Sequence, residues 1–160
     1  MDFIKAAMYQ FGEQIKGELE RIESMKQSAS PIDFAKLETV VIGVLPGDGI
    51  GPIITEQALR VLRHLMSKEI AGGQLDIRVI EGMTIENRAA TRQSLPEDVF
   101  EQVKCCHVLL KGPMVTPRAG DSWPNLVSAN TLLRRGLDLY AAVRPVRLRE
   151  QGLDWAFFRE

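Results

Sequence analysis

The sequence has little net charge, few cysteines and no long apolar run, and each shortage excludes a class of protein. The 20 Lys and Arg residues nearly balance the 21 Asp and Glu residues, so the total charge indicates neither nucleic acid nor an anionic membrane as a partner. The longest apolar runs, such as TVVIGVL at 39–45, are far too short to cross a bilayer. The start of the chain also lacks the pattern of a secretory signal. We therefore expect a cytoplasmic protein.

The two cysteines, Cys105 and Cys106, are adjacent, and sequence neighbours rarely bond to each other because disulfide geometry would strain the backbone. No histidine pattern of zinc spacing accompanies them. We expect a reduced, partly buried pair. With 160 residues and 45% apolar content, the chain can bury one sizeable core.

Residues 2–27 carry apolar side chains at steps of three and four positions, which predicts an amphipathic helix. A strict coiled-coil seam would place Glu18 where an apolar residue belongs. Docking on the chain's own body or on a sister subunit is therefore favoured over a foreign partner. Ser and Pro then break the pattern, so we assign 1–28 to an N-terminal helix and 29–37 to a linker.

From residue 38 onward, short apolar runs alternate with helical patterns. Strands are predicted in ETVVIGVLPG, QLDIRVIEG and CHVLLKGP, and helices in GPIITEQALRVLRHLMSKEI and PEDVFEQVKC. Alternating strands and helices favour parallel pairing through crossover connections. The expected fold class is α/β, with a mostly parallel sheet flanked by helices and an extra N-terminal helix.

PGDGIGP, at 46–52, lies where a predicted strand passes into a helix. Its glycines permit a tight turn and close approach of a ligand, and the free amides of a helix start favour an anion. The alternating glycines lack the two-residue gap of the dinucleotide fingerprint. The spacing leaves open whether the motif binds an anion or only turns, and whether Asp48 caps the helix or takes part in chemistry.

SANTLLRRG predicts a short helix with a possible binding face. Ser128 can cap it, and Asn130 and Arg134 are four residues apart, so they share one face near the positive end of the helix. Gly136 is expected to end the helix. Pro145 should keep the following LDLYAAVRPVR extended.

Arg144 and Arg159 each follow a strand-like apolar run, and strand ends are where open α/β sheets hold ligands. The planar guanidinium matches a carboxylate at two points. Alternatively, the arginines are solvated or paired with acidic neighbours, and spacing leaves this open for the binding set. The candidate acidic partners are Asp138, Glu150 and Glu160, and we assign Arg135, Arg147 and Arg149 to this alternative.

Four segments resemble, in order, the N-terminal part of the β-decarboxylating dehydrogenases, which act on isocitrate, isopropylmalate, homoisocitrate or tartrate. The segments are VIGVLPGDGIGPIITEQALRVL, VLLKGPMVTP, SANTLLRRGLDLYAAVRPVR and FFRE, within residues 38–160. Ser-x-Asn followed by Arg, Leu-Asp-Leu-Tyr and Arg-Pro-Val-Arg is similar to the isocitrate enzymes, because isopropylmalate enzymes usually carry apolar residues at the Ser-x-Asn place. The resemblance implies that 38–127 begins the large α/β domain and that 128–160 begins the small substrate domain.

The resemblance also implies site residues. The residues that match those holding the substrate's carboxylates are Ser128, Asn130, Arg134, Arg144 and Arg159. Thr116, together with Asn130, matches residues at the nicotinamide end of the cofactor. The implied reaction is oxidative decarboxylation of isocitrate, a tricarboxylate, to 2-oxoglutarate in the tricarboxylic acid cycle. NAD or NADP takes the hydride, and Mg or Mn chelates the substrate and stabilises the enolate.

Several features depart from the family pattern. Ile53 stands where many members carry Glu, the loop TPRAGDSWPNLVS is longer than is common, and the N-terminal helix has no counterpart in shorter members. The family's catalytic Tyr and Lys and its metal-binding Asp residues belong to later segments. We therefore expect no catalytic residue and no metal ligand in this chain, inactivity of the chain alone, and a homo-oligomer when complete. The alternatives are an isopropylmalate or homoisocitrate dehydrogenase relative and a non-catalytic regulatory or assembly subunit.

Overall fold

The computed structural model describes residues 3–27 and 32–159. The chain divides into two compact units, Met1–Leu37 and Glu38–Glu160. Residues 1–2 and 28 of the predicted N-terminal helix, residues 29–31 of the predicted linker and Glu160 lie outside the described residues. Within the described ranges, every helix is too short or too polar to span a bilayer.

The first unit contains the predicted N-terminal helix, α1 (Phe3–Gln27), followed by one 3-10 turn, η1 (Phe34–Lys36). No residue of α1 is buried. Its charged side chains pair along the helix surface, as in Arg21 with Glu18 at 3.2 Å and Lys26 with Glu23 at 2.7 Å. Such exposed pairs each add little to stability. The large apolar side chains of α1 are exposed as well.

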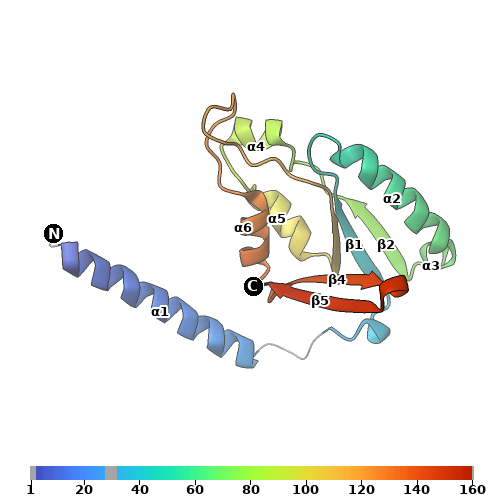
Figure 1. Cartoon of the computed structure of the whole chain (residues 1–160), viewed down its shortest axis with the longest axis horizontal. Helices are drawn as coiled ribbons and strands as arrows, with labels where there is room; N and C mark the ends of the chain where they lie inside the picture. The colour runs from blue at the N-terminus through green and yellow to red at the C-terminus, as the bar shows by residue number, and fades with distance from the viewer. Residues whose placement is uncertain (1–2, 28–31, 160) are drawn as a thin grey trace. The chain divides into compact units, whose positions relative to one another are not determined.

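A three-stranded parallel sheet forms the centre of the second unit (Figure 1). Its strands are β1 (Val40–Leu45), β2 (Leu75–Val79) and β3 (Val108–Lys111), in the order β2-β1-β3. Ile42 pairs with both Ile77 and Val108. The α/β class and the parallel pairing predicted from the sequence are confirmed.

The connecting helices differ in two places from the sequence prediction. The single helix predicted over 51–70 is two helices, α2 (Gly51–Leu65) and α3 (Ser67–Ala71), because Met66 leaves helical geometry at φ −103°, ψ 24°. An additional short helix, α4 (Ile85–Thr91), precedes the predicted helix α5 (Glu97–Lys104). Thr84 caps α4 by accepting a hydrogen bond from the Asn87 amide. Seven residues are too few to show a clear helical period, which explains why α4 was missed.

The main core lies between the sheet and the helices α5 and α6 (Ala129–Gly136). Figure 1 shows α2 and α3 on the other side of the sheet. The core combines residues from strands, loops and helices: Leu45, Ile80, Met83, Val99, Val103, Met114, Ala129 and Leu133. Burial of such side chains contributes about 1.5–3 kcal/mol each, and this packing fixes the start of α6 against the sheet.

The last part of the chain forms an antiparallel hairpin, β4 (Ala142–Leu148) and β5 (Leu153–Arg159), which the sequence reading did not predict. A 3-10 turn, η2 (Arg149–Gln151), and Gly152 at φ +65° join the strands. Trp155 and Phe157 contact edge to face, with ring centroids 6.1 Å apart. The hairpin is exposed over nearly its whole length.

Candidate substrate-binding site

Two glycine-containing loops cross at the carboxyl ends of β1 and β3. The Asp48 amide donates to the Pro113 carbonyl at 2.7 Å, and the Gly112 amide donates to the Leu45 carbonyl at 2.8 Å. A Cβ at Gly47 would lie 2.1 Å from the Pro113 oxygen. Close backbone packing therefore requires glycine at Gly47 and at Gly112, where an added Cβ would lie 2.0 Å from the Pro46 oxygen. PGDGIGP is a turn packed against the neighbouring loop.

Asp48 neither caps α2 with its side chain nor faces solvent. Ile50 is the N-cap residue of α2, which has no side-chain cap. The Asp48 carboxylate is 2% exposed and accepts hydrogen bonds from the Ile85 amide at 2.6 Å, the Val115 amide at 2.7 Å and the Arg88 guanidinium at 2.8 Å. These donors engage both carboxylate oxygens, so Asp48 ties three segments of the chain together.

Helix α6 presents the first group of predicted ligands. Ser128 occupies the N-cap position, but its hydroxyl makes no capping hydrogen bond. The predicted N-cap position of Ser128 is therefore confirmed, whereas its hydroxyl forms no capping hydrogen bond. Asn130 is half-buried and Arg134 is exposed, one turn apart on the helix. Ala129 and Leu133, about 100° around the helix axis from this pair, anchor α6 in the core.

Lys111, at the last position of β3, is a basic residue that the sequence reading missed. Partial burial lowers the pKa of its ammonium group, the charge of Arg134 lowers it further, and Asp48 opposes the shift. Lys111 donates to the Gly112 carbonyl at 2.6 Å. Its position could have been inferred from the carboxyl-end rule for parallel strands. Lys111 and Arg134 therefore form a positive region at this end of the sheet.

Gly136 ends α6, as predicted. It is the last helical residue, and the left-handed residue beyond it is Asp138 at φ +48°. The Leu139 amide closes the end by donating to the Arg134 carbonyl at 3.0 Å. A Cβ at Gly136 would lie 2.6 Å from the Phe100 ring. A side chain at this position would therefore require the Phe100 ring to shift.

The hairpin presents the second group, Arg144 and Arg159. Arg144 lies within β4 and pairs with Phe157, while Arg159 ends β5 and pairs with Ala142. Directly opposite residues share a face, and diagonal neighbours are about 7–8 Å apart. Arg144 and Arg159 are therefore diagonal neighbours on one face of the hairpin. The expectation that both lie at the ends of open-sheet strands is wrong, because an antiparallel hairpin carries them.

The two groups are not joined to each other: no hydrogen bond or ion pair within residues 32–159 links α6 to Arg144 or Arg159. Of the arginines assigned to solvent or acidic partners, Arg147 pairs with Asp154 at 3.0 Å, both exposed. Arg135 and Arg149 are exposed. Asp154 is not one of the acidic partners expected from the sequence, because the hairpin register brings it opposite Arg147.

For a nicotinamide cofactor, the described residues offer a partial fit. The Oδ1 atom of Asn130 is buried without a hydrogen-bond partner in the described part of the chain, and such an atom costs about 1–3 kcal/mol when unpaired. A carboxamide N–H₂ is a donor that would satisfy it. Thr116 is exposed in the loop after β3. The position of Asn130 is therefore compatible with the nicotinamide end.

For a divalent metal, the chain offers no comparable fit. Within residues 3–27 and 32–159, no group of three His, Cys, Asp or Glu side chains could hold an ion. Asp48, the buried carboxylate beside Lys111, already accepts three hydrogen bonds. We therefore derive no step of a reaction through a metal.

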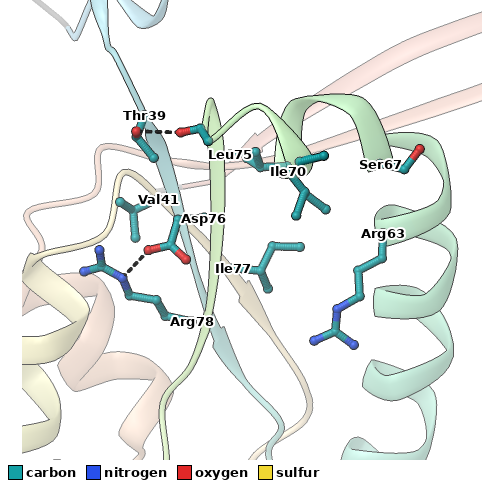
Figure 2. Close-up of a pocket in the computed structure, with 11 residues that line it drawn as sticks. Thr39, Val41, Arg63, Ser67, Ile70, Leu75, Asp76, Ile77 and Arg78 are labelled. Atoms are coloured by element: carbon teal, nitrogen blue, oxygen red, sulfur yellow. Dashed lines mark hydrogen bonds and ion pairs between the residues drawn. The ribbon is translucent and has the colours of Figure 1, made fainter.

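A surface pocket of about 810 Å³ lies away from all these residues (Figure 2). It is bordered by Thr39 and Gly73, which precede β1 and β2, and by the exposed edge of β2. Figure 2 shows Asp76 paired with Arg78 and the Arg63 side chain of α2 along its wall. The pocket begins at the amino ends of the strands, whereas open α/β sheets hold ligands at the carboxyl ends. It contains none of the predicted site residues.

The second unit is a parallel α/β fold with two basic residues, Lys111 and Arg134, at the carboxyl end of its sheet. Comparison with known proteins narrows this class. Residues 41–159 match the family model for isocitrate/isopropylmalate dehydrogenase. The chain belongs to this family.

The similar proteins include enzymes for both substrates. The chain is 32% identical to isocitrate dehydrogenase [NADP] of Caldococcus noboribetus, over 77% of this chain and 30% of that protein. It is 38% identical to isocitrate dehydrogenase [NADP] of Thermus thermophilus, over 67% and 20%. It is 36% identical to 3-isopropylmalate dehydrogenase of Carboxydothermus hydrogenoformans, over 64% and 28%.

The solved structures include a similar fold. The crystal structure of TT0538 protein from Thermus thermophilus superposes with a TM-score of 0.57 at 30% identity, over 81% of this chain and 27% of that one. The chain thus spans less than a third of the length of the relatives described here.

Proposed function

We propose that this chain is the N-terminal portion of an NAD(P)-dependent isocitrate dehydrogenase and provides part of the site that binds the substrate's carboxylates. The enzyme would convert isocitrate to 2-oxoglutarate with NAD or NADP and Mg or Mn. The observation that carries the proposal is the placement of Ser128, Asn130 and Arg134 on α6, with Arg134 close enough to Lys111 to lower its pKa. The names of the similar enzymes support it.

The binding step follows from the charges of the chain's own residues. Lys111 and Arg134 are both cationic and repel each other, so a multiply negative ligand beside them removes an unfavourable interaction. The Ser128 hydroxyl, which makes no capping hydrogen bond, is available to donate to a carboxylate oxygen. Arg144 and Arg159 add two planar forks from one face of the hairpin.

The cofactor's proposed place is at Asn130 and Thr116. When bound, NAD(P) would accept the hydride from the hydroxyl-bearing carbon of the substrate. Asn130 would orient the carboxamide through its unpaired Oδ1 atom, and Thr116 would contact the same end. The arginines would orient the acid and offset its charge; they are not proton-transfer groups. We propose that the catalytic Tyr and Lys and the metal-binding Asp residues come from other parts of the enzyme, and that the enzyme is a homo-oligomer.

The test is NAD(P) reduction with isocitrate and Mg²⁺, measured on this chain and on the product of the complete reading frame that contains it. Reduction by the complete product, with this chain alone inactive, would support the proposal. Faster reduction with 3-isopropylmalate than with isocitrate would favour 3-isopropylmalate as the substrate. This alternative is supported by the 36% identity to the Carboxydothermus hydrogenoformans enzyme. Isocitrate binding without turnover by the complete product would indicate a regulatory subunit.

Arg134→Ala and Arg135→Ala provide a matched pair in the complete product. Both arginines are exposed on α6, but only Arg134 is coupled to Lys111. We expect Arg134→Ala to lower kcat/KM for isocitrate at least tenfold and Arg135→Ala to change it less than twofold. Equal effects of the two substitutions would remove Arg134 from the site.

A further inference from the structure

A buried ion pair lies next to the proposed cofactor site and has no role in the binding steps above. Arg88 is 0% exposed and its Nη2 atom lies 2.8 Å from Oδ2 of Asp48. Buried ion pairs are weak evidence for a stabilising role, because apolar residues of similar volume often serve as well. The role of this ion pair is therefore inferred from its contacts.

The pair holds both backbone polar atoms of one loop residue. The Val115 amide donates to Oδ2 of Asp48 at 2.7 Å, and the Val115 carbonyl accepts from Nη2 of Arg88 at 2.9 Å. The Val115 carbonyl belongs to the same planar peptide unit as the Thr116 amide. Fixing Val115 at both atoms thus sets the plane from which Thr116 starts.

Regular secondary structure does not hold this loop. Between the end of β3 at Lys111 and the start of α6 at Ala129, the described chain contains neither helix nor strand. The other contacts of the pair lead to α4: Asp48 accepts from the Ile85 amide, and Arg88 Nε donates to the Met83 carbonyl at 3.1 Å. The ion pair therefore connects the loop to two packed segments.

We propose that Arg88 is a positioning residue, which acts with Asp48 to hold the Val115–Thr116 peptide in the orientation needed by the nicotinamide end of the cofactor. The identity of the ligand in this inference rests on the proposed function. The contacts that fix Val115 are independent of it. Arg88 acts through Val115 and not by direct contact with the ligand: its side chain is 0% exposed, and its Nη1 atom has no hydrogen-bond partner within the described residues. Its effect is expected on cofactor binding more than on isocitrate binding.

The experiment compares Arg88→Lys with Thr84→Ala. Lysine keeps a cation beside Asp48 but cannot reproduce the guanidinium's simultaneous contacts with Asp48, Met83 and Val115. Thr84→Ala removes the cap of α4 without removing any contact to Val115, and so controls for a general loss of stability. The complete product is assayed for KM of NAD(P), KM of isocitrate and Tm. Amide hydrogen exchange is measured on this chain.

For Arg88→Lys we expect the KM for NAD(P) to rise at least fivefold, with the KM for isocitrate changed less than twofold. The Val115 amide should exchange at least tenfold faster, while the Ile85 amide changes less. Thr84→Ala should lower Tm without either effect. If Arg88→Lys does not fold, the Asp48→Asn, Arg88→Gln double variant removes both buried charges together and is measured instead, with the same expectations.

Unchanged NAD(P) KM in Arg88→Lys would overturn the inference, as would an equal rise in Thr84→Ala, which would reduce Arg88 to a structural role. If the wild-type complete product reduces neither cofactor, the proposed function fails and the cofactor role of Arg88 fails with it. In that case the amide exchange rate of Val115 still tests whether the ion pair holds the Val115–Thr116 peptide. Fast exchange at Val115 would still show that the ion pair holds this peptide, and unchanged exchange would show that it does not.

Discussion

The crossing of the two loops at the ends of β1 and β3 predicts a large loss of stability in Gly112→Ala. An added Cβ would lie 2.0 Å from the Pro46 carbonyl oxygen, 2.8 Å from its carbon and 3.0 Å from Oγ1 of Thr55. The first contact is with backbone, which cannot rotate away. Relief of the clash requires the loops to separate by about 1 Å.

Such a separation would break the hydrogen bonds that join the loops. The Asp48–Pro113 bond is 2.7 Å and the Gly112–Leu45 bond is 2.8 Å, so they would lengthen to about 3.7 Å and about 3.8 Å, beyond the range of a hydrogen bond. Each buried group left unpaired costs about 1–3 kcal/mol. We expect Gly112→Ala to lower the free energy of unfolding by about 2–6 kcal/mol, although the substitution also restricts the unfolded chain.

Gly49→Ala is the matched control. Gly49 has φ +59° and no atom within 4 Å of an added Cβ, so only left-handed strain applies, about 1–2 kcal/mol. Urea unfolding of the chain, followed by tryptophan fluorescence, gives the midpoint and slope for both variants. A loss in Gly112→Ala no larger than the loss in Gly49→Ala would refute the close-approach reasoning. A Gly112→Ala variant already unfolded without urea would agree with it.

Three further predictions follow from the site and its surroundings. Arg134→Met should raise the lowered pKa of Lys111, and bound isocitrate should raise it as well. Because the pKa of Lys111 is lower in the folded state than in the unfolded chain, the free energy of unfolding should increase as pH rises through the folded-state pKa toward 10.5. NMR titration of the lysine Cε resonance checks the pKa, and an unchanged value refutes the coupling. Iodoacetamide should modify Cys106 more slowly than exposed Cys105 at neutral pH, because burial raises the pKa of the Cys106 thiol; mass spectrometry measures the order, and faster labelling of Cys106 contradicts it. Arg144→Ala should lower kcat/KM for isocitrate at least tenfold in the complete product. An unchanged kcat/KM would exclude Arg144 from the substrate-binding site.

Local patterns were sufficient for the parts of the fold that depend on regular periodicity. The helix α1 and the three strands were predicted because their apolar residues recur at helical or strand spacing. The start of α6 was predicted from Ser128 as its N-cap residue. The expected partial burial of the cysteine pair is confirmed for Cys106 and wrong for Cys105, which is exposed. The short helix α4 and the break at Met66 were missed, because neither changes the hydrophobic pattern over more than one turn.

Prediction of the site from sequence was less complete. Ser128, Asn130 and Arg134 share one short helix, so their grouping follows from spacing. Arg144 and Arg159 share a face only because β4 and β5 pair antiparallel in one particular register. A shift of that register by one residue would place them on opposite faces. Their assignment as carboxylate ligands stays a prediction.

By itself, the sequence determined the α/β class, the parallel strands and the short basic helix, since these depend on propensity and on neighbours a few residues apart. Only the tertiary structure decided that Asp48 is an internal tie, that Lys111 lies beside Arg134 and that Arg88 is buried. Asp48 and Arg88 are 40 positions apart, and Asp48 and Val115 are 67 apart. No local pattern records such pairings, because they arise when parallel strands bring distant loops to the same edge of the sheet.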